Sequence, residues 1–194
     1  RHPSPTGRRF AEEAGYALAA AGVAVVSGLA RGIDACAHVG ALRARGRDTG
    51  VVPTVAVVAT GLDSCYPAEH RTLFRQIAEA GAILSEFPPG SPPIKVHFIR
   101  RNRLLAGLAR LTVVVEAREK SGALVTAQYA AEQGSEVAAL PGDVYNPAAA
   151  GPNRLLADGA AAAAGVAALL EHATLLGILP RAARRRGWRA APPA

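Results

Sequence analysis

The densest group of side chains that could bind a ligand lies in residues 95–103, which read Lys-Val-His-Phe-Ile-Arg-Arg-Asn-Arg. Cationic side chains neutralise phosphate groups, and an exposed phenylalanine offers a base a surface on which to stack. The pattern therefore predicts binding of single-stranded nucleic acid. The residues that we expect to carry it are Lys95, Phe98, Arg101, Asn102 and Arg103.

Helical spacing places the arginines of this cluster on different faces of the helix. On a helix Arg100 and Arg103 share one face, whereas Arg101 points elsewhere. We therefore expect that the three do not grip one ligand together and that at least one of them is structural. The alternative for the whole cluster is a solvated helix start with Phe98 in the core.

A second candidate lies in residues 27–34, Ser-Gly-Leu-Ala-Arg-Gly-Ile-Asp, where an apolar run ends and a helical pattern begins. Small residues let backbone N–H groups approach an anion, and a helix N-terminus carries partial positive charge. We predict an anion site here, formed by Ser27, Gly28, Arg31 and Gly32. The segment is neither a P-loop nor the spaced glycine triplet of a dinucleotide site. A plain glycine turn that packs the helix on the sheet is the alternative.

Ser121 and Gly122 follow another apolar run and open another helical pattern. They could bind an anion, or Ser121 could simply cap the helix while small residues pack tightly behind it. Both interpretations stand, and we include the pair among the candidate DNA-binding residues. Glu116 ends the preceding strand, and we expect it to pair with an arginine.

Residue types that suggest catalysis are present but poorly arranged. Asp63, Cys65 and His70 lie on one predicted loop, yet Cys65 lacks the partner arrangement that activates a nucleophile. His38 lies between alanine and valine on a predicted helix and is interpreted as a packing residue. Because no carboxylate pair or metal-ligand spacing stands out, we assign no catalytic residue and expect neither a metal nor a cofactor.

The overall composition favours a polyanionic partner. The 194-residue chain has a formal net charge of +7 and a pI near 10.2, and almost all its cations are arginine. Half of its residues are hydrophobic, which indicates a folded globule. With two cysteines and no apolar run of the roughly 20 residues that span a bilayer, we expect a cytoplasmic protein without membrane contact. Because methionine is absent, we expect a fragment or a processed chain.

Apolar runs of strand length alternate with helical patterns along most of the chain. The runs are nearly continuous Val, Ile, Ala and Leu, which is typical of parallel strands buried on both faces. The pattern predicts an α/β fold with a doubly wound, mostly parallel sheet, whose ligands bind at the carboxyl ends of the strands. We expect strands over residues 23–27, 54–59, 82–86, 112–116 and 137–140, and helices over residues 7–21, 34–45, 69–80, 101–109 and 123–133.

Several of these motifs together resemble the DprA/Smf family, the DNA-processing proteins of bacterial transformation. They stand in the family's order and cover roughly residues 1–160. The resemblance rests on residues 27–34, 61–67, 85–90, 95–103, 121–127, 141–142 and 151–160.

The resemblance implies an extended Rossmann fold that binds single-stranded DNA in a basic pocket and loads the recombinase RecA onto it. It also implies a homodimer and no enzymatic activity. Carried over to this sequence, Arg31, Lys95, Arg101 and Arg103 would line or support the pocket, and Phe98 would meet a base.

One departure from the family concerns the sheet. The family places a strand ending in Gly-Ser-Arg before residues 1–7, and only Arg1 of it remains here. We therefore expect the sheet to lack a central first strand and Arg1 to belong to the DNA site. We expect residues 1–160 to form the DNA-binding domain, 161–180 a helical extension and 181–194 a basic, disordered tail.

Two other interpretations remain open. The first is a nucleotide-binding or nucleotide-hydrolysing Rossmann protein related to the phosphoribohydrolases. Those enzymes carry Pro-Gly-Gly-x-Gly-Thr, whereas residues 141–146 read Pro-Gly-Asp-Val-Tyr-Asn, which counts against hydrolysis. The second is a remnant with no biochemical role.

Overall fold

The computed structural model describes residues 3–45 and 50–179. Arg1 of the predicted DNA site and the expected tail over residues 181–194 lie outside the described residues.

Parallel strands and helices alternate as expected from the apolar runs. The strands are β1 (Val25–Ser27), β2 (Thr54–Val57), β3 (Ala82–Leu84), β4 (Leu111–Val114), β5 (Glu136–Ala139) and β6 (Ala161–Ala162). The helices are α1 (Pro5–Ala20), α2 (Ile33–Arg43), η1 (Ala68–His70, a 3₁₀ turn), α3 (Arg71–Ala80), α4 (Lys95–Leu108), α5 (Gly122–Glu132), α6 (Ala150–Ala157) and α7 (Val166–Leu175).

Helix α4 begins at Lys95, earlier than the expected start at residue 101. Pro92 and Pro93 end the extended segment before it, and Ile94 at the N-cap is still extended. The imidazole Nδ1 of His97 lies 3.0 Å from the carbonyl of Pro92 and ties the first turn to that segment. The whole basic cluster is therefore helical.

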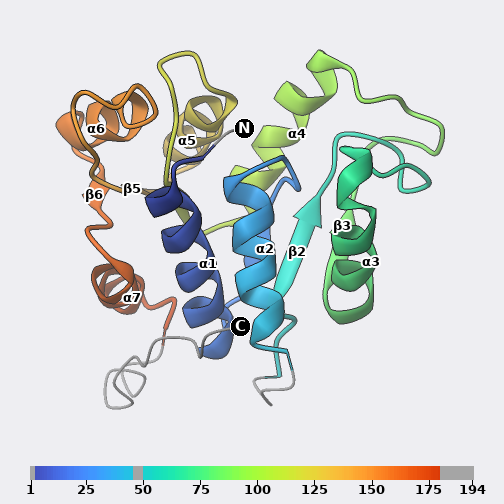
Figure 1. Cartoon of the computed structure of the whole chain (residues 1–194), viewed down its shortest axis with the longest axis horizontal. Coiled ribbons are helices and arrows are strands. Elements are labelled where there is room, and N and C mark those ends of the chain that lie inside the picture. Colours follow the sequence, from blue (N-terminus) through green and yellow to red (C-terminus); the bar gives the residue numbers. More distant parts are fainter. Residues whose placement is uncertain (1–2, 46–49, 180–194) are drawn as a thin grey trace.

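In the part of the chain that the structure describes, the strands form two three-stranded parallel sheets, β1-β2-β3 and β4-β5-β6. The parallel α/β fold class is confirmed. Within residues 3–45 and 50–179 no strand pairing joins the two sheets. Helices α1, α2 and α3 lie on the near face in Figure 1, and α4 and α5 lie behind.

Helix α1 packs across the middle of the molecule, between the half with β5 and β6 and the half with β2 and β3 (Figure 1). Its Phe10 and Ala14 share a core cluster with Val115 at the end of β4 and with Leu169 of α7. Since these contacts join distant parts of the chain, α1 holds the two halves together through apolar burial.

Candidate nucleic-acid interface

Helix α4 brings the predicted site segments together at the carboxyl ends of the strands. The Arg101 guanidinium donates to the carbonyl of Gly28 at 2.8 Å and to that of Val57. The neighbouring Asn102 amide donates to the carbonyl of Gly122 at 3.1 Å. Gly28 directly follows β1 and Gly122 opens α5 after β4, so two adjacent residues of α4 bridge the two half-sheets.

Arg101 is a buried bridge and not an exposed phosphate ligand. Its side chain is 4% exposed, and burial lowers its pKa while Asp34 opposes that effect. A Cβ at Gly28 would lie 2.5 Å from the guanidinium, so only glycine lets the backbone approach it. Arg101 therefore stabilises the turn after β1 through its hydrogen bond to the Gly28 carbonyl.

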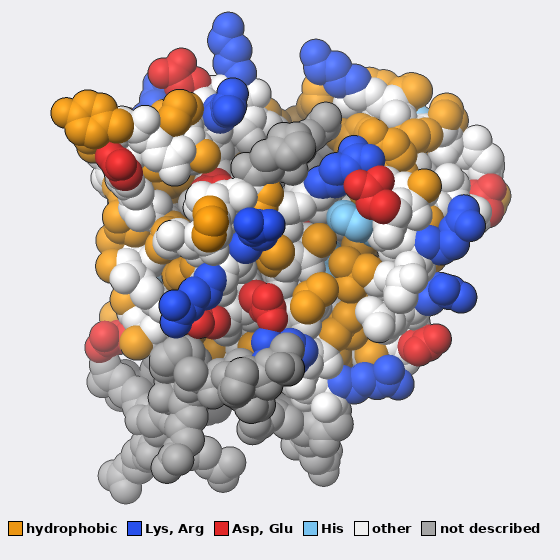
Figure 2. All heavy atoms as spheres, viewed as in Figure 1, with side chains coloured by type: hydrophobic (Ala, Val, Ile, Leu, Met, Phe, Trp, Pro, Cys, Tyr) orange, Lys and Arg blue, Asp and Glu red, His pale blue; other side chains and the backbone are white. Residues whose placement is uncertain are grey.

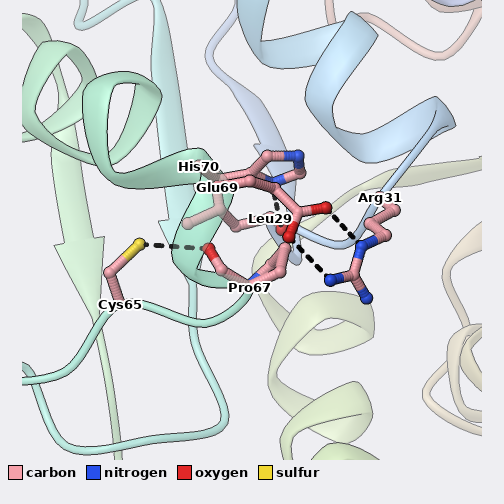
Figure 3. Close-up of polar contacts among 6 residues, drawn as sticks. All are labelled: Leu29, Arg31, Cys65, Pro67, Glu69 and His70. Carbon is pink, nitrogen blue, oxygen red and sulfur yellow. Dashed lines mark hydrogen bonds and ion pairs between the residues drawn. The ribbon is translucent and has the colours of Figure 1, made fainter.

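The turn after β1 has an unusual backbone. Leu29 is fully buried with φ +59°, in the left-handed region that few non-glycine residues adopt. The carbonyl of Leu29 accepts a hydrogen bond at 3.0 Å from the imidazole of His70 (Figure 3). The amide of Ala30 donates to Asp34 at 3.0 Å. Gly32 is the N-cap of α2, so no side chain caps this helix and its first-turn amides stay open to an anion.

Arg31 projects from this turn and pairs with Glu69. Both nitrogens on one edge of the guanidinium donate to the carboxylate, one of them at 2.7 Å, as Figure 3 shows. The shared hydrogen bond raises the pKa of Arg31 and lowers that of Glu69. Arg103 on α4 also forms an ion pair, in which one terminal nitrogen donates to the carboxylate of Glu86. Arg31 and Arg103, both predicted to bind phosphate, therefore already form ion pairs with carboxylates of the chain.

Lys95 and Arg100 complete the cationic face of α4. Both are exposed, and within the described ranges no acidic partner of Lys95 lies in ion-pair distance. The Arg100 guanidinium lies 5.7 Å from the ring centre of Phe87. Figure 2 shows the face of the molecule that carries α1, α2 and α3, where cationic side chains are scattered and several lie beside acidic ones.

Phe98 is half-buried, so it is neither the fully exposed stacking surface nor the core residue that the sequence left open. Its ring meets Tyr66 edge-on with centroids 5.6 Å apart, and the Arg101 guanidinium lies 6.0 Å from its centre. Phe87 stacks on His97 at 4.1 Å nearby. The edge thus carries aromatic rings interleaved with arginines.

At the start of α5 the structure shows the capping role of Ser121. Ser121 is the N-cap of α5, and its hydroxyl accepts from the amide of Ala123 at 3.3 Å. Among the described residues the Glu116 carboxylate accepts from the Ser4 amide, at 3.0 Å, and from the Ser4 hydroxyl. The arginine partner expected for Glu116 stays a prediction. Anion binding by Ser121 and Gly122 stays a prediction.

The sequence did not point to Glu69 and Glu86 as partners of the arginines at this edge. It also gave no sign of the ring contacts that Tyr66 and Arg100 make. Glu69 lies 38 residues from Arg31 and Glu86 lies 17 from Arg103, so helical spacing could not have paired them. The sequence signal that they carry is their position after the carboxyl ends of β2 and β3.

The described thiols show no sign of activation. Burial raises the pKa of both Cys65 and Cys36, which keeps them protonated. The Cys65 thiol lies 3.5 Å from the carbonyl of Pro67 (Figure 3). Within residues 3–45 and 50–179 no three metal-binding side chains gather, and no helix is both long and apolar enough to cross a bilayer.

Together the fold and this edge define a Rossmann-like α/β protein whose arginines and aromatic rings collect at the carboxyl ends of parallel strands. The chain belongs to the family of DNA recombination-mediator protein A, whose model matches residues 1–174. The DprA/Smf resemblance is thereby confirmed.

Relatives in several bacteria support the same assignment. The chain is 50% identical to Protein Smf of Synechocystis sp. over 141 residues, covering 73% of this chain and 34% of that protein. It is 40% identical to DNA processing protein DprA of Bacillus subtilis over 162 residues, covering 84% of this chain and 52% of that protein. The chain thus spans about half or less of these relatives.

A solved structure agrees in fold. It is DNA processing protein A from Helicobacter pylori, described for its single-stranded DNA binding mode. The match has a TM-score of 0.79 at 28% identity and covers 92% of this chain and 77% of that one.

Proposed function

We propose that this chain binds single-stranded DNA at the carboxyl edge of β1 and β2, as the DNA-binding part of a recombination mediator. The observation that carries the proposal is the Arg101 bridge, which sets the basic face of α4 beside the turn that holds Arg31. Membership of the recombination-mediator family supports the same ligand.

On binding, the paired arginines would exchange their carboxylate partners for phosphates of the DNA. A guanidinium that grips a carboxylate in bidentate fashion grips a phosphate in the same geometry. Arg31 and Arg103 would leave Glu69 and Glu86 for the DNA backbone, and Lys95 would add a point charge. Phe98 and Tyr66 would stack on bases, which tolerates any sequence.

We also infer that RecA is loaded by this protein onto the bound strand and that the chain acts as a cytoplasmic homodimer without catalysing a reaction. These inferences rest on family membership. The domain limits at residues 160 and 180, and the roles of Arg1, Ser121 and Gly122, belong to the same proposal.

Titration of a fluorescein-labelled 20-mer of deoxythymidine, followed by anisotropy, tests the DNA site. The double variant Lys95→Ala/Arg103→Ala should bind at least tenfold more weakly and should lower the salt slope by about 1.4, since each phosphate contact on a single strand contributes about 0.7. The matched control is Arg45→Ala/Arg75→Ala, which removes two exposed charges outside this edge. If both double variants bind equally, the proposed site is wrong.

A further inference from the structure

Two pairs of aromatic rings meet at the first turn of α4, and the proposed function uses only one of them. Phe98 meets Tyr66 edge-on, with an angle of 61° between the ring planes. The residue before it, His97, stacks on Phe87 with ring centres 4.1 Å apart and an angle of 23°. Because consecutive residues of a helix point about 100° apart, the two pairs lie on different sides of α4. We call the second one the His97–Phe87 pair.

Phe87 is a fixed support for the imidazole of this pair. Only 9% of Phe87 is exposed. Its amide donates to the Ser85 hydroxyl at 3.0 Å, and that hydroxyl donates to the Thr60 carbonyl at 2.6 Å. Ser85 directly follows β3 and Thr60 follows β2, so the Phe87 ring is anchored to the carboxyl ends of two neighbouring strands.

The imidazole of His97 is held in one orientation although it is partly exposed. Its Nδ1 lies 3.0 Å from the Pro92 carbonyl, and since a carbonyl only accepts, Nδ1 carries the proton. Stacking on Phe87 sets the plane of the ring, and this hydrogen bond sets its direction within that plane. A ring that is already ordered loses little conformational entropy when a ligand binds to it, which favours affinity.

Two cations lie close to the His97–Phe87 pair along α4. Lys95 is two residues before His97, and Arg100 is three residues after it, with its guanidinium 5.7 Å from the centre of the Phe87 ring. Both are exposed, and in the described part of the chain no carboxylate lies within ion-pair distance of either. Unlike Arg31 and Arg103, they need not leave a carboxylate before they bind a phosphate.

We propose that the His97–Phe87 pair is a second stacking site for a base of single-stranded DNA, with Arg100 binding the phosphate beside that base. The inference rests on the proposed function, because it adds a base position to the same DNA site. The imidazole face that Phe87 leaves uncovered receives the base. Since every base has a π-face, the pair adds affinity and length to the site without sequence preference.

Titration of the full chain with a fluorescein-labelled 8-mer of deoxythymidine, followed by anisotropy, tests the second stacking site. His97→Ala should weaken binding about fivefold or more, which is the effect of losing one stacked base. The salt slope should not change, because no phosphate contact is removed. His97→Phe keeps a ring on Phe87 and should bind within about threefold of the unaltered chain. The matched control is His172→Ala, which removes a histidine of α7 outside this edge and should bind normally.

A fluorescent base gives a readout that a purely structural role of His97 would not move. 2-Aminopurine loses fluorescence when it stacks on an aromatic ring. With a deoxythymidine 8-mer that contains 2-aminopurine and at saturating protein, quenching should be smaller in His97→Ala than in the unaltered chain and should return in His97→Phe. If His97→Ala does not fold, as judged by circular dichroism, His97→Leu takes its place, because leucine packs on Phe87 but offers no aromatic face.

Two results would overturn the proposal. Equal affinity and equal quenching in His97→Ala and His172→Ala would show that no base stacks on this pair. Loss of both in His97→Ala without recovery in His97→Phe would assign His97 to holding Pro92 in place.

Failure of this inference is distinguishable from failure of the proposed function. If Lys95→Ala/Arg103→Ala weakens binding while His97→Ala does not, only the second stacking site is wrong. If Lys95→Ala/Arg103→Ala binds like its own control, the DNA site itself is wrong.

Discussion

The carboxyl edges of the two half-sheets have the same topology but treat their polar groups differently. At β1-β2-β3 the first turn of α2 has only Gly32 at its N-cap, and exposed cations surround it. At β4-β5-β6 the chain satisfies itself: Ser121 caps α5, Ser4 binds Glu116, and the Asn153 amide exchanges two hydrogen bonds with Gly142 at 3.1 and 3.0 Å.

This difference shows that a position at the carboxyl ends of parallel strands is not sufficient for a ligand site. The rule that ligands bind at carboxyl ends applies equally to both half-sheets. What separates them is the helix N-terminus: no side chain caps α2, whereas the Ser121 hydroxyl caps α5. The first edge holds its charges in exposed pairs that a phosphate can replace, whereas the second is closed by partly buried contacts within the chain.

Arg101→Ala should have the largest effect on the first edge. It leaves two buried carbonyls, those of Gly28 and Val57, without their donor and removes a packed side chain. At about 1–3 kcal/mol for each unsatisfied group, we expect a loss of about 3–5 kcal/mol in the free energy of unfolding. Urea denaturation followed by circular dichroism measures it. The control Arg100→Ala removes an exposed neighbour and should cost under about 0.5 kcal/mol. Equal losses would show that Arg101 is not the bridge.

Much of this architecture could be predicted from the sequence, because continuous apolar runs report burial on both faces. The strands predicted over residues 23–27 and 54–59 contain β1 and β2, and the ligand edge follows from their direction. The role of Arg101 was only partly predictable. Helical spacing separated it from Arg103, but its burial depends on carbonyls 44 and 73 residues away.

Partners far apart in sequence were not predictable at all. Ser4 meets Glu116 across 112 residues, and no local pattern links a serine before a helix to a carboxylate after a strand. The same limit hid the partners of Arg31 and Arg103. Because the chain must fold before such groups meet, only the tertiary arrangement decides which cations are paired.

The buried His38 should make the free energy of unfolding depend on pH. Its Nδ1 lies 2.7 Å from the Thr54 hydroxyl, which itself donates to the Val25 carbonyl, so Nδ1 must carry the proton. Within residues 3–45 and 50–179 no group hydrogen-bonds to the buried Nε2. Burial, with smaller contributions from His70 and Arg101, lowers the pKa of His38 to about 4, while Asp34 opposes the shift.

The sign of that dependence follows from the lowered pKa. The unfolded chain binds a proton near pH 6.5 and the folded chain only near pH 4. Stability is therefore full above pH 6.5 and falls as the pH drops toward 4, by up to about 3 kcal/mol. Urea denaturation at pH 7, 6 and 5 measures the slope. In His38→Gln the slope should be smaller; an unchanged slope would assign the dependence to other groups.

Glu116→Ala should affect the second edge without affecting the first. The Ser4 amide and hydroxyl lose their acceptor, and the N-cap of α1 is no longer anchored. We expect a loss of about 1–2 kcal/mol in the free energy of unfolding, and DNA affinity equal to that of Glu119→Ala. Glu119 is exposed in the same loop and carries the same charge, so it is the matched control. A selective change in DNA affinity in Glu116→Ala would place this edge in the DNA site.

Glu69→Gln should produce the smallest effect and test the comparison most directly. If Arg31 must leave a carboxylate to reach a phosphate, removing that charge frees the guanidinium and also removes repulsion of the DNA. A unit charge at about 4 Å contributes about 1 kcal/mol in water, so affinity for the labelled 20-mer should rise about three- to fivefold at low salt. The gain should shrink as salt screens the pair. Glu79→Gln removes the same exposed charge from its pair with Arg45 and should leave affinity nearly unchanged. A gain of equal size in both variants would mean that only net charge matters, and the first edge would then be no more open to a ligand than the second.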